Sequence, residues 1–423
     1  MSGFGCVILA AGKGTRFYSD IPKVLHDLHG KPILQHVLDT ASACGFEKPV
    51  VVIGHKAGET ERFLKGKART VVQEKQLGTA DAVKVAKKEL SGFDDIAVLY
   101  GDVPLVKIGT LRFLMKQHKA SASSCTVLTV DMDDPSGYGR IIRGISGGVK
   151  AIVEDKEAVA DEKRVREINV GLYCFDRKDL FEAISRVQKS KVKKEFYLTD
   201  VIEILLEDGR KVSAFKTDDP GESIGMNSRA DLAKAYSVLG RRKVAELIKG
   251  SVTVLDPATT FISPDAKIGK DTVIYPFTFI EKDVVIGKRC AIGPFCRLRP
   301  GTTIDDDAEI GNFVEIVRSK IGSKSKAKHL TYLGDTVVGK GANVGCGTIT
   351  ANYDGKKKSR TVIGDKVFVG SGTILVAPVK VGNGAVTGAG SVVLKNNNIP
   401  AKAVAVGVPA RILDKSKKAK GKR

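Results

Sequence analysis

The chain of 423 residues has no hydrophobic run long enough to cross a membrane, and its seven cysteines include no CxxC pair. A membrane-spanning helix needs about 20 apolar residues, whereas the N-terminal apolar run Cys6–Ala11 is short and has no basic segment before it. Scattered cysteines argue against a zinc site or a disulfide framework and indicate reduced, packed thiols. We therefore expect a soluble, cytoplasmic protein with no membrane partner.

Acidic residues are also scarce: 48 Asp and Glu stand against 69 Lys and Arg, a net charge of +21. This balance suits a nucleic-acid binder, an enzyme whose positive clefts attract phosphates, or an ordinary solvated surface. Residues 415–423 carry six positive charges and no negative one, so we expect 412–423 to be a disordered basic tail. Of these alternatives we favour the enzyme, without a nucleic-acid partner.

A six-residue repeat dominates the second half of the chain. From Ile262 to Ile316 an apolar residue returns at every sixth position, and the repeat resumes after interruptions at 317–337 and 350–362. A period of six fits neither a helix nor an ordinary strand. It is typical of a parallel β-helix, in which each rung places one apolar residue inward. We expect the two interruptions to be surface loops, where functional residues often lie.

The first half alternates short apolar runs with helical patterns, which predicts a mostly parallel sheet covered on both faces. The expected strands are 6–11, 49–53, 70–73, 96–100, 125–130 and 170–174, and the expected helices are 33–44, 80–90, 110–118, 177–187 and 198–206. We predict an α/β domain over 1–226, a linker helix over 227–250 and a β-helix over 251–411.

A glycine-rich loop follows the first predicted strand, in the segment Leu9-Ala10-Ala11-Gly12-Lys13-Gly14-Thr15-Arg16. Its glycines allow backbone N–H groups to approach an anion, and its basic residues add positive charge. It is neither a Walker A loop nor a dinucleotide fingerprint, because Phe17 stands where a third glycine is needed. Lys23 follows as another cation, or as a plain surface lysine.

Further segments make the pattern specific: Pro22-Lys23-Val24-Leu25, Gln73 to Ala80, Tyr100-Gly101-Asp102-Val103-Pro104, Gly137-Tyr138-Gly139-Arg140 and Glu167-Ile168-Asn169. From Val7 to about Pro409 the chain resembles the bacterial bifunctional N-acetylglucosamine-1-phosphate uridyltransferases / glucosamine-1-phosphate N-acetyltransferases. The resemblance implies a Rossmann-like nucleotidyltransferase domain, a linker helix and a left-handed β-helix, assembled as a homotrimer. It also implies acetyl transfer from acetyl-CoA to glucosamine-1-phosphate, then uridylyl transfer from UTP with release of pyrophosphate.

For uridylyl transfer, the resemblance implies that Arg16 faces the pyrophosphate, Lys23 the α-phosphate, and that Asp102 and Asn227 bind Mg²⁺. The alternative for Asp102 is a turn cap, and for Asn227 the N-cap of the linker helix. The implied nucleotide-binding residues are Leu9, Ala10, Ala11, Gly12, Gly14, Lys23, Gln73, Gly78, Thr79, Tyr100 and Asp102. The implied sugar-binding residues are Gly139, Glu154, Asn169, Thr199 and Asn227.

For acetyl transfer, the resemblance implies that His329 is the base, since imidazole titrates near neutrality. It is the only histidine in the repeat domain. The implied acetyl-acceptor residues are Arg299, Tyr332, Asn343 and Lys358, and the implied acetyl-CoA residues are Cys346, Asn352, Tyr353, Ser371 and Ala389. The chain departs from the family at Val317, where a lysine that binds the sugar phosphate is usual. Either one phosphate contact is lost or Arg318 takes it over. The region between 251 and 293 is shorter by about two coils.

Two alternatives stay open at this point. In one, the chain transfers uridylyl groups only, and the β-helix is a trimerisation scaffold. In the other, it is a non-catalytic regulatory protein of the same architecture. The presence of Arg16, Lys23, Asp102, Asn227 and His329 favours an enzyme over a regulatory protein.

Overall fold

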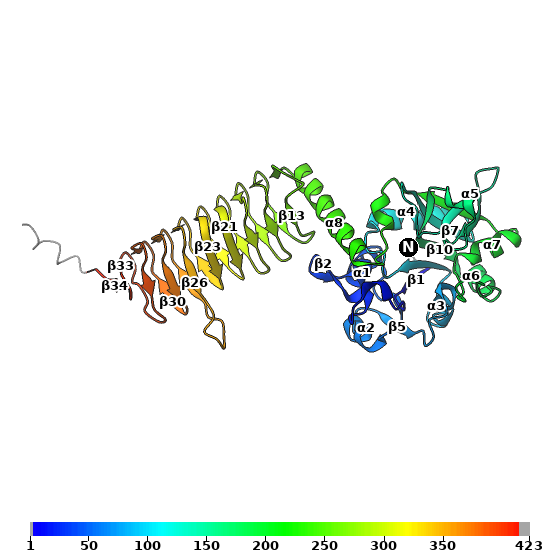
Figure 1. Cartoon of the computed structure of the whole chain (residues 1–423), viewed down its shortest axis with the longest axis horizontal. Helices are drawn as coiled ribbons and strands as arrows, with labels where there is room; N and C mark the ends of the chain where they lie inside the picture. Colours follow the sequence, from blue (N-terminus) through cyan, green and yellow to red (C-terminus); the bar gives the residue numbers. More distant parts are fainter. Residues whose placement is uncertain (1–2, 414–423) are drawn as a thin grey trace, which may run out of the picture. The chain divides into compact units, whose positions relative to one another are not determined.

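The structure is a computed structural model that describes residues 3–413 and divides into two compact units between Tyr236 and Ser237 (Figure 1). The boundary falls inside helix α8 (Arg229–Lys249). The last strand, β34, ends at Ile412, so the predicted tail beyond Leu413 lies outside the described residues. No helix among residues 3–413 combines the length and the apolar character needed to span a bilayer.

The N-terminal unit is built on a nine-stranded sheet whose main path runs β11-β7-β10-β6-β1-β4-β5. The strands are β1 (Phe4–Leu9), β4 (Val50–Ile53), β5 (Arg69–Val72), β6 (Asp95–Tyr100), β7 (Cys125–Asp131), β8 (Arg140–Arg143), β9 (Val149–Val153), β10 (Glu167–Asp176) and β11 (Val212–Lys216), with β2 (Asp27–Leu28) and β3 (Lys31–Pro32) as a separate pair. The six expected strands are confirmed. Four neighbouring pairs of the main path are parallel, and β10 is antiparallel to both β6 and β7.

Helices cover both faces of this sheet. They are α1 (Ile33–Ala43), α2 (Ala57–Leu64), α3 (Thr79–Val85), α4 (Ile108–Ser121), α5 (Ala160–Lys163), α6 (Arg177–Ile184) and α7 (Asp200–Glu207), with 3₁₀ turns η1 (Thr15–Phe17), η2 (Lys23–Leu25) and η3 (Pro220–Ser223). All five expected helices are present, with boundaries shifted by a few residues. The helices α2 and α5 and the strands β8, β9 and β11 are additional to the predicted elements.

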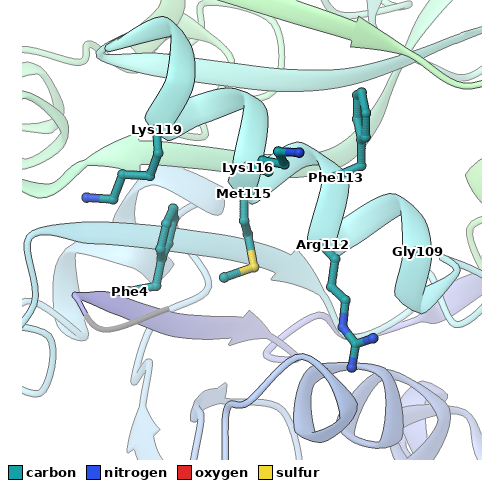
Figure 2. Close-up of a pocket in the computed structure, with 7 residues that line it drawn as sticks. All are labelled: Phe4, Gly109, Arg112, Phe113, Met115, Lys116 and Lys119. Atoms are coloured by element: carbon teal, nitrogen blue, oxygen red, sulfur yellow. The ribbon is translucent and has the colours of Figure 1, made fainter.

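Successive residues of the central strands enter two different cores. In β1, Val7 packs in one core and Ile8 in the other, and both side chains are fully buried. Met115 of α4 lies beside Phe4 in the second core (Figure 2). A strand buried on both faces needs apolar residues at every position, which explains the uninterrupted apolar runs of this half of the sequence.

The C-terminal unit is a parallel β-helix. Its strands are β12 (Thr253–Val254), β13 (Phe261–Ile262), β14 (Lys267–Ile268), β15 (Val273–Ile274), β16 (Phe279–Ile280), β17 (Val285–Ile286), β18 (Ala291–Ile292), β19 (Arg297–Leu298), β20 (Thr303–Ile304), β21 (Glu309–Val317), β22 (Lys320–Ile321), β23 (Lys326–Gly334), β24 (Thr336–Val338), β25 (Asn343–Val344), β26 (Ile349–Ala351), β27 (Thr361–Ile363), β28 (Phe368–Val369), β29 (Ile374–Val376), β30 (Val379–Val381), β31 (Val386–Thr387), β32 (Val392–Val393), β33 (Val404–Val406) and β34 (Arg411–Ile412). Most strands pair in parallel with the strand 18 residues later, as Ile286 does with Ile304.

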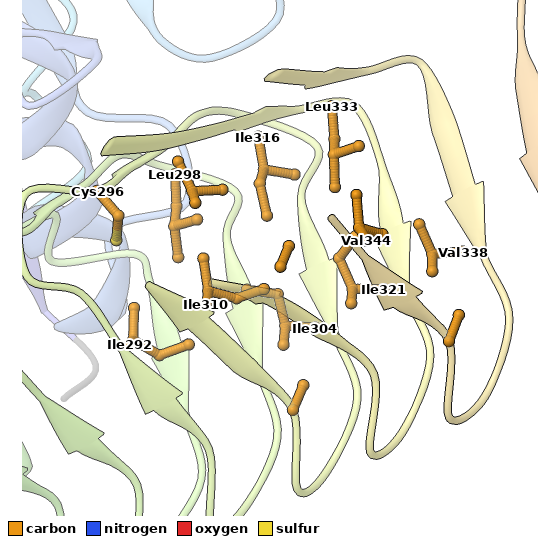
Figure 3. Close-up of a cluster of buried hydrophobic side chains, with 14 of the residues drawn as sticks. Ile292, Cys296, Leu298, Ile304, Ile310, Ile316, Ile321, Leu333, Val338 and Val344 are labelled. Carbon is orange, nitrogen blue, oxygen red and sulfur yellow. The ribbon is translucent and has the colours of Figure 1, made fainter. Parts of the chain in front are cut away.

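The six-residue repeat forms the interior of this β-helix. Figure 3 shows part of the buried ladder, including Ile292, Ile304 and Val344. The repeat residues pack in one core cluster, with Ile268 only partly buried at its edge. Burying a side chain of this size contributes about 1.5–3 kcal/mol. Repetition of that contribution along the ladder explains how strands of two residues form a stable wall.

The first interruption of the repeat is not a loop, and that expectation was wrong. Strands β21 and β23 pair continuously, with Asn312 opposite His329, a spacing of 17 residues instead of 18. One turn is a single residue shorter, so the inward positions shift to Ile321, Ala327 and Leu333, all buried. The apolar ladder never stops, and His329 lies in a strand at a corner of the coil.

The second interruption is a surface loop, as expected. Thr336 pairs with Thr361, so this coil is 25 residues long. The added residues fold back on themselves, with Tyr353 bridged to Lys358. Asp354 accepts backbone hydrogen bonds from Lys356 and Lys357 at 3.1 and 2.9 Å. The loop is therefore held by its own turn.

Asn227 is not the N-cap of α8, which was the alternative to a metal-binding role for this residue. Ser228 and Asp231 exchange capping hydrogen bonds: the Ser228 N–H donates to Asp231 Oδ2 at 2.8 Å, and the Asp231 N–H donates to Ser228 Oγ at 3.3 Å. Ser228 therefore caps the helix, and Asn227 lies one residue outside it. All seven cysteines are free, and six of them are buried, which confirms the expectation of packed thiols.

Candidate functional site

A cavity of about 460 Å³ opens at the carboxyl ends of β1 and β6, where ligands of parallel sheets usually bind. Every residue proposed above to bind the nucleotide lines it: Leu9, Ala10, Ala11, Gly12, Gly14, Lys23, Gln73, Gly78, Thr79, Tyr100 and Asp102. These residues come from four separate segments of the sequence. The tertiary structure therefore brings the predicted nucleotide set together in one nucleotide pocket.

The charged centre of the nucleotide pocket is an ion pair between Lys23 Nζ and Asp102 Oδ2. Both side chains are largely shielded, with 11% and 22% of their surface exposed. Gly14 has a left-handed backbone (φ 60°), and a Cβ there would lie 2.7 Å from the Lys23 Cβ. The glycine is thus required both for the turn and for the position of Lys23.

Gln73 is fixed at the wall of the nucleotide pocket. Its Nε2 donates to the Gly78 carbonyl at 3.1 Å and to Asp81 Oδ2 at 2.8 Å, and its side chain is buried. Both amide hydrogens are therefore used by the protein, which leaves Oε1 as an acceptor. Gly78 has φ 120°, and an added Cβ would collide with the Phe196 backbone at 2.3 Å.

Four of the predicted sugar residues lie in or next to different elements: Gly139 precedes β8, Glu154 follows β9, Asn169 is in β10 and Thr199 precedes α7. The Asn169 N–H donates to the Gly139 carbonyl at 2.9 Å, and Asn169 Nδ2 donates to the Tyr173 hydroxyl at 2.5 Å. Thr199 Oγ1 donates to Glu154 Oε1 at 3.1 Å. Burial raises the pKa of Glu154, while the Thr199 hydrogen bond opposes the rise.

Asn227 approaches the pocket through the backbone. The Met226 N–H donates to the Asp102 carbonyl at 2.8 Å, which anchors the segment before α8 beside the end of β6. Mg²⁺ prefers oxygen ligands and retains several waters, so one carboxylate and one amide suffice. Asp102 and Asn227 fit such a site, and Lys23 supplies a positive charge at the same carboxylate.

The lining of the nucleotide pocket contains neither Arg16 nor the predicted sugar residues Gly139, Glu154, Asn169, Thr199 and Asn227. The Arg16 side chain is exposed in η1. The lining also contains residues that carried no assigned role above: Lys13, Thr15, Val24, Gln76, Ala82 and Glu195. Most of these lie inside the quoted motifs, so the motifs already contained that signal. Glu195 comes from a distant lysine-rich loop, and no local pattern marks it.

The second group of predicted residues lies at one corner of the β-helix. Ala327 pairs with Val344, so His329 and Cys346 hold equivalent positions in successive coils. The Gly372 N–H donates to the Cys346 carbonyl and the Gly390 N–H to the Ser371 carbonyl, both at 2.7 Å. His329, Cys346, Ser371 and Ala389 therefore form a corner column, with one residue per coil.

Glycines accompany this column. Gly347, Gly372 and Gly390 follow its members, each with φ near 70°. In the preceding coil the same corner carries Leu330, which is 58% exposed. The glycine strip is therefore free of side chains and ends where His329 and Leu330 begin. The imidazole of His329 is exposed and makes no hydrogen bond with any residue in the described range.

Beside the column, Tyr332 and Asn352 meet above Gly334. A Cβ on Gly334 would lie 2.5 Å from the Tyr332 hydroxyl and 2.6 Å from Asn352 Nδ2. Asn352 Nδ2 also donates to Asp335 Oδ2. The missing side chain of Gly334 therefore lets these two polar groups converge.

The other predicted acceptor residues are more dispersed. Arg299 donates from Nη1 to Glu315 Oε1 at 2.7 Å, and Lys358 is exposed in the inserted loop. Asn343 pairs with Lys326, so it lies on the wall of the β-helix that precedes the His329 corner in the chain. Tyr332 pairs with Ile349 and lies on the wall that follows this corner. A single chain thus places Asn343 and Tyr332 on different walls that meet at His329.

Comparison with known proteins covers both units. The Nucleotidyl transferase family matches residues 6–226, and the Bacterial transferase hexapeptide (six repeats) family matches 265–300, 283–318 and 360–395. The chain is 43% identical to the Bifunctional protein GlmU of Shouchella clausii (strain KSM-K16), over 96% of both chains. It is 43% identical to that of Geobacillus thermodenitrificans (strain NG80-2), over 95% of this chain and 94% of the relative. It is 45% identical to the Bifunctional protein GlmU of Pelotomaculum thermopropionicum (strain SI), over 88% of this chain and 89% of the relative.

The chain belongs to the GlmU family. Its resemblance to this family is confirmed over nearly the full length, and both domain types are present in the expected order. The chain is therefore a bifunctional transferase enzyme. The Nucleotidyl transferase match lies in the first unit and the hexapeptide matches lie in the second.

Val317 stands where the resemblance described above led us to expect a lysine. Val317 is buried, with 2% of its surface exposed. The neighbouring Arg318 donates from Nε and Nη2 to the two carboxylate oxygens of Asp335 at 2.7 and 2.8 Å. The hydrogen bonds from Arg318 hold the pKa of Asp335 below its usual range. The Arg318 charge is thus already matched within the chain.

Replacing Gly334 with alanine should lower acetyl transfer about 100-fold, because Tyr332 and Asn352 must move apart and a displacement near 1 Å has that cost. Uridylyl transfer should be unchanged. Steady-state rates of both reactions measure this. Gly58→Ala, where an added Cβ meets nothing within 4 Å, is the control. Unchanged acetyl transfer in Gly334→Ala would show that the convergence above Gly334 is not needed.

The partly buried carboxyl of Asp200 should make the stability of the fold depend on pH. Burial, followed by the charges of Glu157 and Glu154, raises its pKa to about 6. Folding therefore favours the protonated carboxyl, so its contribution is intact below pH ~4 and is lost as pH rises through ~6. The full shift corresponds to about 3 kcal/mol, which partial exposure reduces to about 1 kcal/mol.

Asp200→Asn should accordingly gain about 1 kcal/mol of stability over the wild type between pH 4 and pH 7.5. Urea unfolding at the two pH values measures the difference. Asp161→Asn is the control, because Asp161 is also in the first turn of a helix but is exposed. A gain independent of pH would contradict the assignment to Asp200.

Proposed function

We propose that the chain makes UDP-N-acetylglucosamine in two steps. The β-helix unit transfers acetyl from acetyl-CoA to the amine of glucosamine-1-phosphate. The N-terminal unit then transfers uridylyl from UTP to N-acetylglucosamine-1-phosphate. The observation that carries this proposal is the nucleotide pocket, in which the predicted residues surround the Lys23–Asp102 pair.

In uridylyl transfer, a phosphate oxygen of N-acetylglucosamine-1-phosphate attacks the α-phosphorus of UTP. The bond from that phosphorus to the bridging oxygen breaks, and pyrophosphate leaves. Lys23 neutralises charge on the α-phosphate, and the backbone of the loop at Gly12 and Gly14 contacts the phosphates. Such reactions depend mainly on positioning and charge neutralisation. The sugar phosphate is already anionic, so no general base is required.

The uracil base and the sugar are recognised by side chains that hydrogen bonds within the protein already hold in place. Gln73 Oε1 is positioned to accept the uracil N3–H, because its amide hydrogens are held by Gly78 and Asp81. Gly139, Glu154, Asn169 and Thr199 form the sugar side. Asp102 and Asn227 hold Mg²⁺, which supplies charge neutralisation at the phosphates when bound. Arg16, exposed in η1 beside the glycine-rich loop, neutralises charge on the leaving pyrophosphate.

In acetyl transfer, the amine of glucosamine-1-phosphate attacks the thioester carbon of acetyl-CoA. His329 accepts the proton that the amine loses, the bond between the carbonyl carbon and sulfur breaks, and the proton passes to the sulfur so that CoA leaves as the thiol. The pantetheine arm lies along the glycine strip beside Cys346, Ser371 and Ala389, with Asn352 and Tyr353 next to it. Arg299, Tyr332, Asn343 and Lys358 hold the sugar phosphate.

The proposal includes a cytoplasmic homotrimer. Three phenylalanines, Phe277, Phe295 and Phe313, stack on successive coils with centroid distances of 4.8 and 5.3 Å. Their exposed fractions are 53%, 45% and 57%. Apolar surface of this kind favours contact with another chain. Separation of Asn343 and Tyr332 on two walls also supports an acceptor site completed by a neighbouring subunit.

Two release assays test the proposal. Acetyl-CoA with glucosamine-1-phosphate should release the CoA thiol, and UTP with N-acetylglucosamine-1-phosphate and Mg²⁺ should release pyrophosphate. Pyrophosphate without thiol release would support the uridylyltransferase-only alternative, with the β-helix as a scaffold. Release of neither product would leave a regulatory protein.

A further inference from the structure

The N-terminal unit has a second cavity, under helix α4. It measures about 560 Å³ and is lined by Phe4, Gly109, Arg112, Phe113, Met115, Lys116 and Lys119 (Figure 2). We call it the α4 pocket. Phe4 begins β1, whereas Leu9 at the other end of β1 lines the nucleotide pocket. At about 3.3 Å per residue the ends of β1 are roughly 16 Å apart, so the two cavities are separate.

The floor of the α4 pocket is apolar and fixed. Phe4 and Met115 are buried to 7% and 1% exposure. Phe113 forms a wall, with its ring packed against Phe215 at a centroid distance of 4.6 Å. Residues 109, 112, 113, 116 and 119 recur at helical spacing, so α4 presents one continuous face to the cavity.

The rim of the α4 pocket is positive. Arg112, Lys116 and Lys119 surround it, and none of the lining residues is acidic. Lys119 is paired with Asp95. Arg112 donates to the Ala43 carbonyl at the end of α1, and no carboxylate in the described part of the chain pairs with it. Lys116 has no hydrogen-bond or ion-pair partner among residues 3–413. Arg112 and Lys116 are therefore two cations without a carboxylate partner beside an apolar floor.

We propose that the α4 pocket binds a small anionic ligand with an aromatic body, such as an aryl carboxylate, sulfonate or phosphate ester. The aromatic part lies on Phe4, Phe113 and Met115, and the anionic group meets Arg112 and Lys116. A volume of 560 Å³ is within the range of small-molecule sites. A low-dielectric floor strengthens the attraction between the anion and the two cations. The site is distinct from the nucleotide pocket.

The probe for the full-length chain is 1-anilinonaphthalene-8-sulfonate, compared with its uncharged analogue N-phenyl-1-naphthylamine by fluorescence titration. We expect saturable binding of one sulfonate probe per chain, unaffected by saturating UTP and Mg²⁺. Lys116→Glu should weaken the sulfonate probe at least about tenfold, the usual effect of a charged hydrogen bond. It should leave the affinity of the uncharged analogue unchanged.

Gly109→Leu tests the cavity itself. An added Cβ at Gly109 meets nothing within 4 Å, and the glycine is in a helix, so leucine fills space without disturbing the fold. It should abolish binding of both probes. Gly58→Leu, in α2 with the same open surroundings, should abolish neither. Equal thermal midpoints for both variants confirm folding.

Three results would overturn the proposal. One is unchanged sulfonate binding in Gly109→Leu, which would place the probe elsewhere. Another is displacement of the sulfonate probe by UTP, which would place it in the nucleotide pocket. The last is an equal loss of affinity for both probes in Lys116→Glu, which would show that the charge of Lys116 does not contribute to binding the anionic group.

Discussion

Replacing His329 with alanine should lower kcat/KM for acetyl transfer about 10³-fold, within the range for loss of a general base. Uridylyl transfer should keep the wild-type rate, because the nucleotide pocket is lined by residues of the other unit. Stability should change little, since the imidazole is exposed and makes no hydrogen bond within the described residues. Thiol release and pyrophosphate release, measured on the same preparation, check both statements.

Two further variants test whether the loss of acetyl transfer comes from loss of the base or from a change in the surrounding structure. His329→Asn retains a polar side chain at the corner but cannot accept the proton near neutral pH, so it should be as slow as His329→Ala. Lys340→Ala, at an exposed turn of the β-helix, should have wild-type rates in both assays. Loss of both activities in His329→Ala would mean that His329 is structural. Wild-type thiol release in His329→Asn would remove its role as the base.

Replacing Asp102 with asparagine should lower uridylyl transfer about 10³-fold, at the upper end of the effect of losing one electrostatic group in a reaction centre. The substitution removes the carboxylate charge that pairs with Lys23 and that we propose binds Mg²⁺. The Met226 hydrogen bond is unaffected, because it goes to the Asp102 backbone carbonyl. A titration with Mg²⁺ should show a higher concentration for half-maximal rate, and thiol release should be normal.

The matched control for Asp102 is another lysine-paired carboxylate of the same unit. Asp131 pairs with Lys216 at 3.0 Å, but both side chains are exposed. An exposed pair contributes little, so Asp131→Asn should leave pyrophosphate release and its Mg²⁺ dependence unchanged. If Asp102→Asn had the Mg²⁺ dependence of the wild type, Asp102 would not be the metal ligand.

The fold followed from two kinds of pattern that report burial directly. In β1 every residue is apolar because both faces are covered, so the run marked a central strand without further information. In the β-helix the sixfold spacing marked the inward positions, and the side chains from Ile274 to Val381 that carry it are buried. Both patterns depend on which side of the backbone faces the core, and that property is local.

The interruption at 317–337 shows where such reasoning fails. A turn shortened by one residue changes the phase of the repeat, and in a linear sequence this is indistinguishable from an inserted loop. The pairing of Asn312 with His329 and the burial of Leu333 resolve the difference. By contrast, the inserted coil at Tyr353 was long enough to be recognised as a loop.

The site divides in a similar way. Motifs such as the loop at Gly12 and the segment after Gln73 supplied the nucleotide residues, because groups that contact one phosphate chain or base cluster in sequence. Glu195 was missed, since it reaches the pocket from a distant loop. Arg16 was grouped with the pocket by its motif, but the left-handed turn at Gly14 leaves it exposed. Arg112 and Lys116 of the α4 pocket belong to no sequence motif described above.

The sequence by itself determined the two architectures, the GlmU family and the identity of most nucleotide-pocket residues, because periodic burial and contiguous motifs are local properties of a chain. Only the tertiary structure decided that Lys23 pairs with Asp102, that His329 heads a column with Cys346, and that Arg112 and Lys116 stand over an apolar floor. Each of these depends on distances between segments far apart in the chain. Such distances are fixed only when strands pair and helices pack.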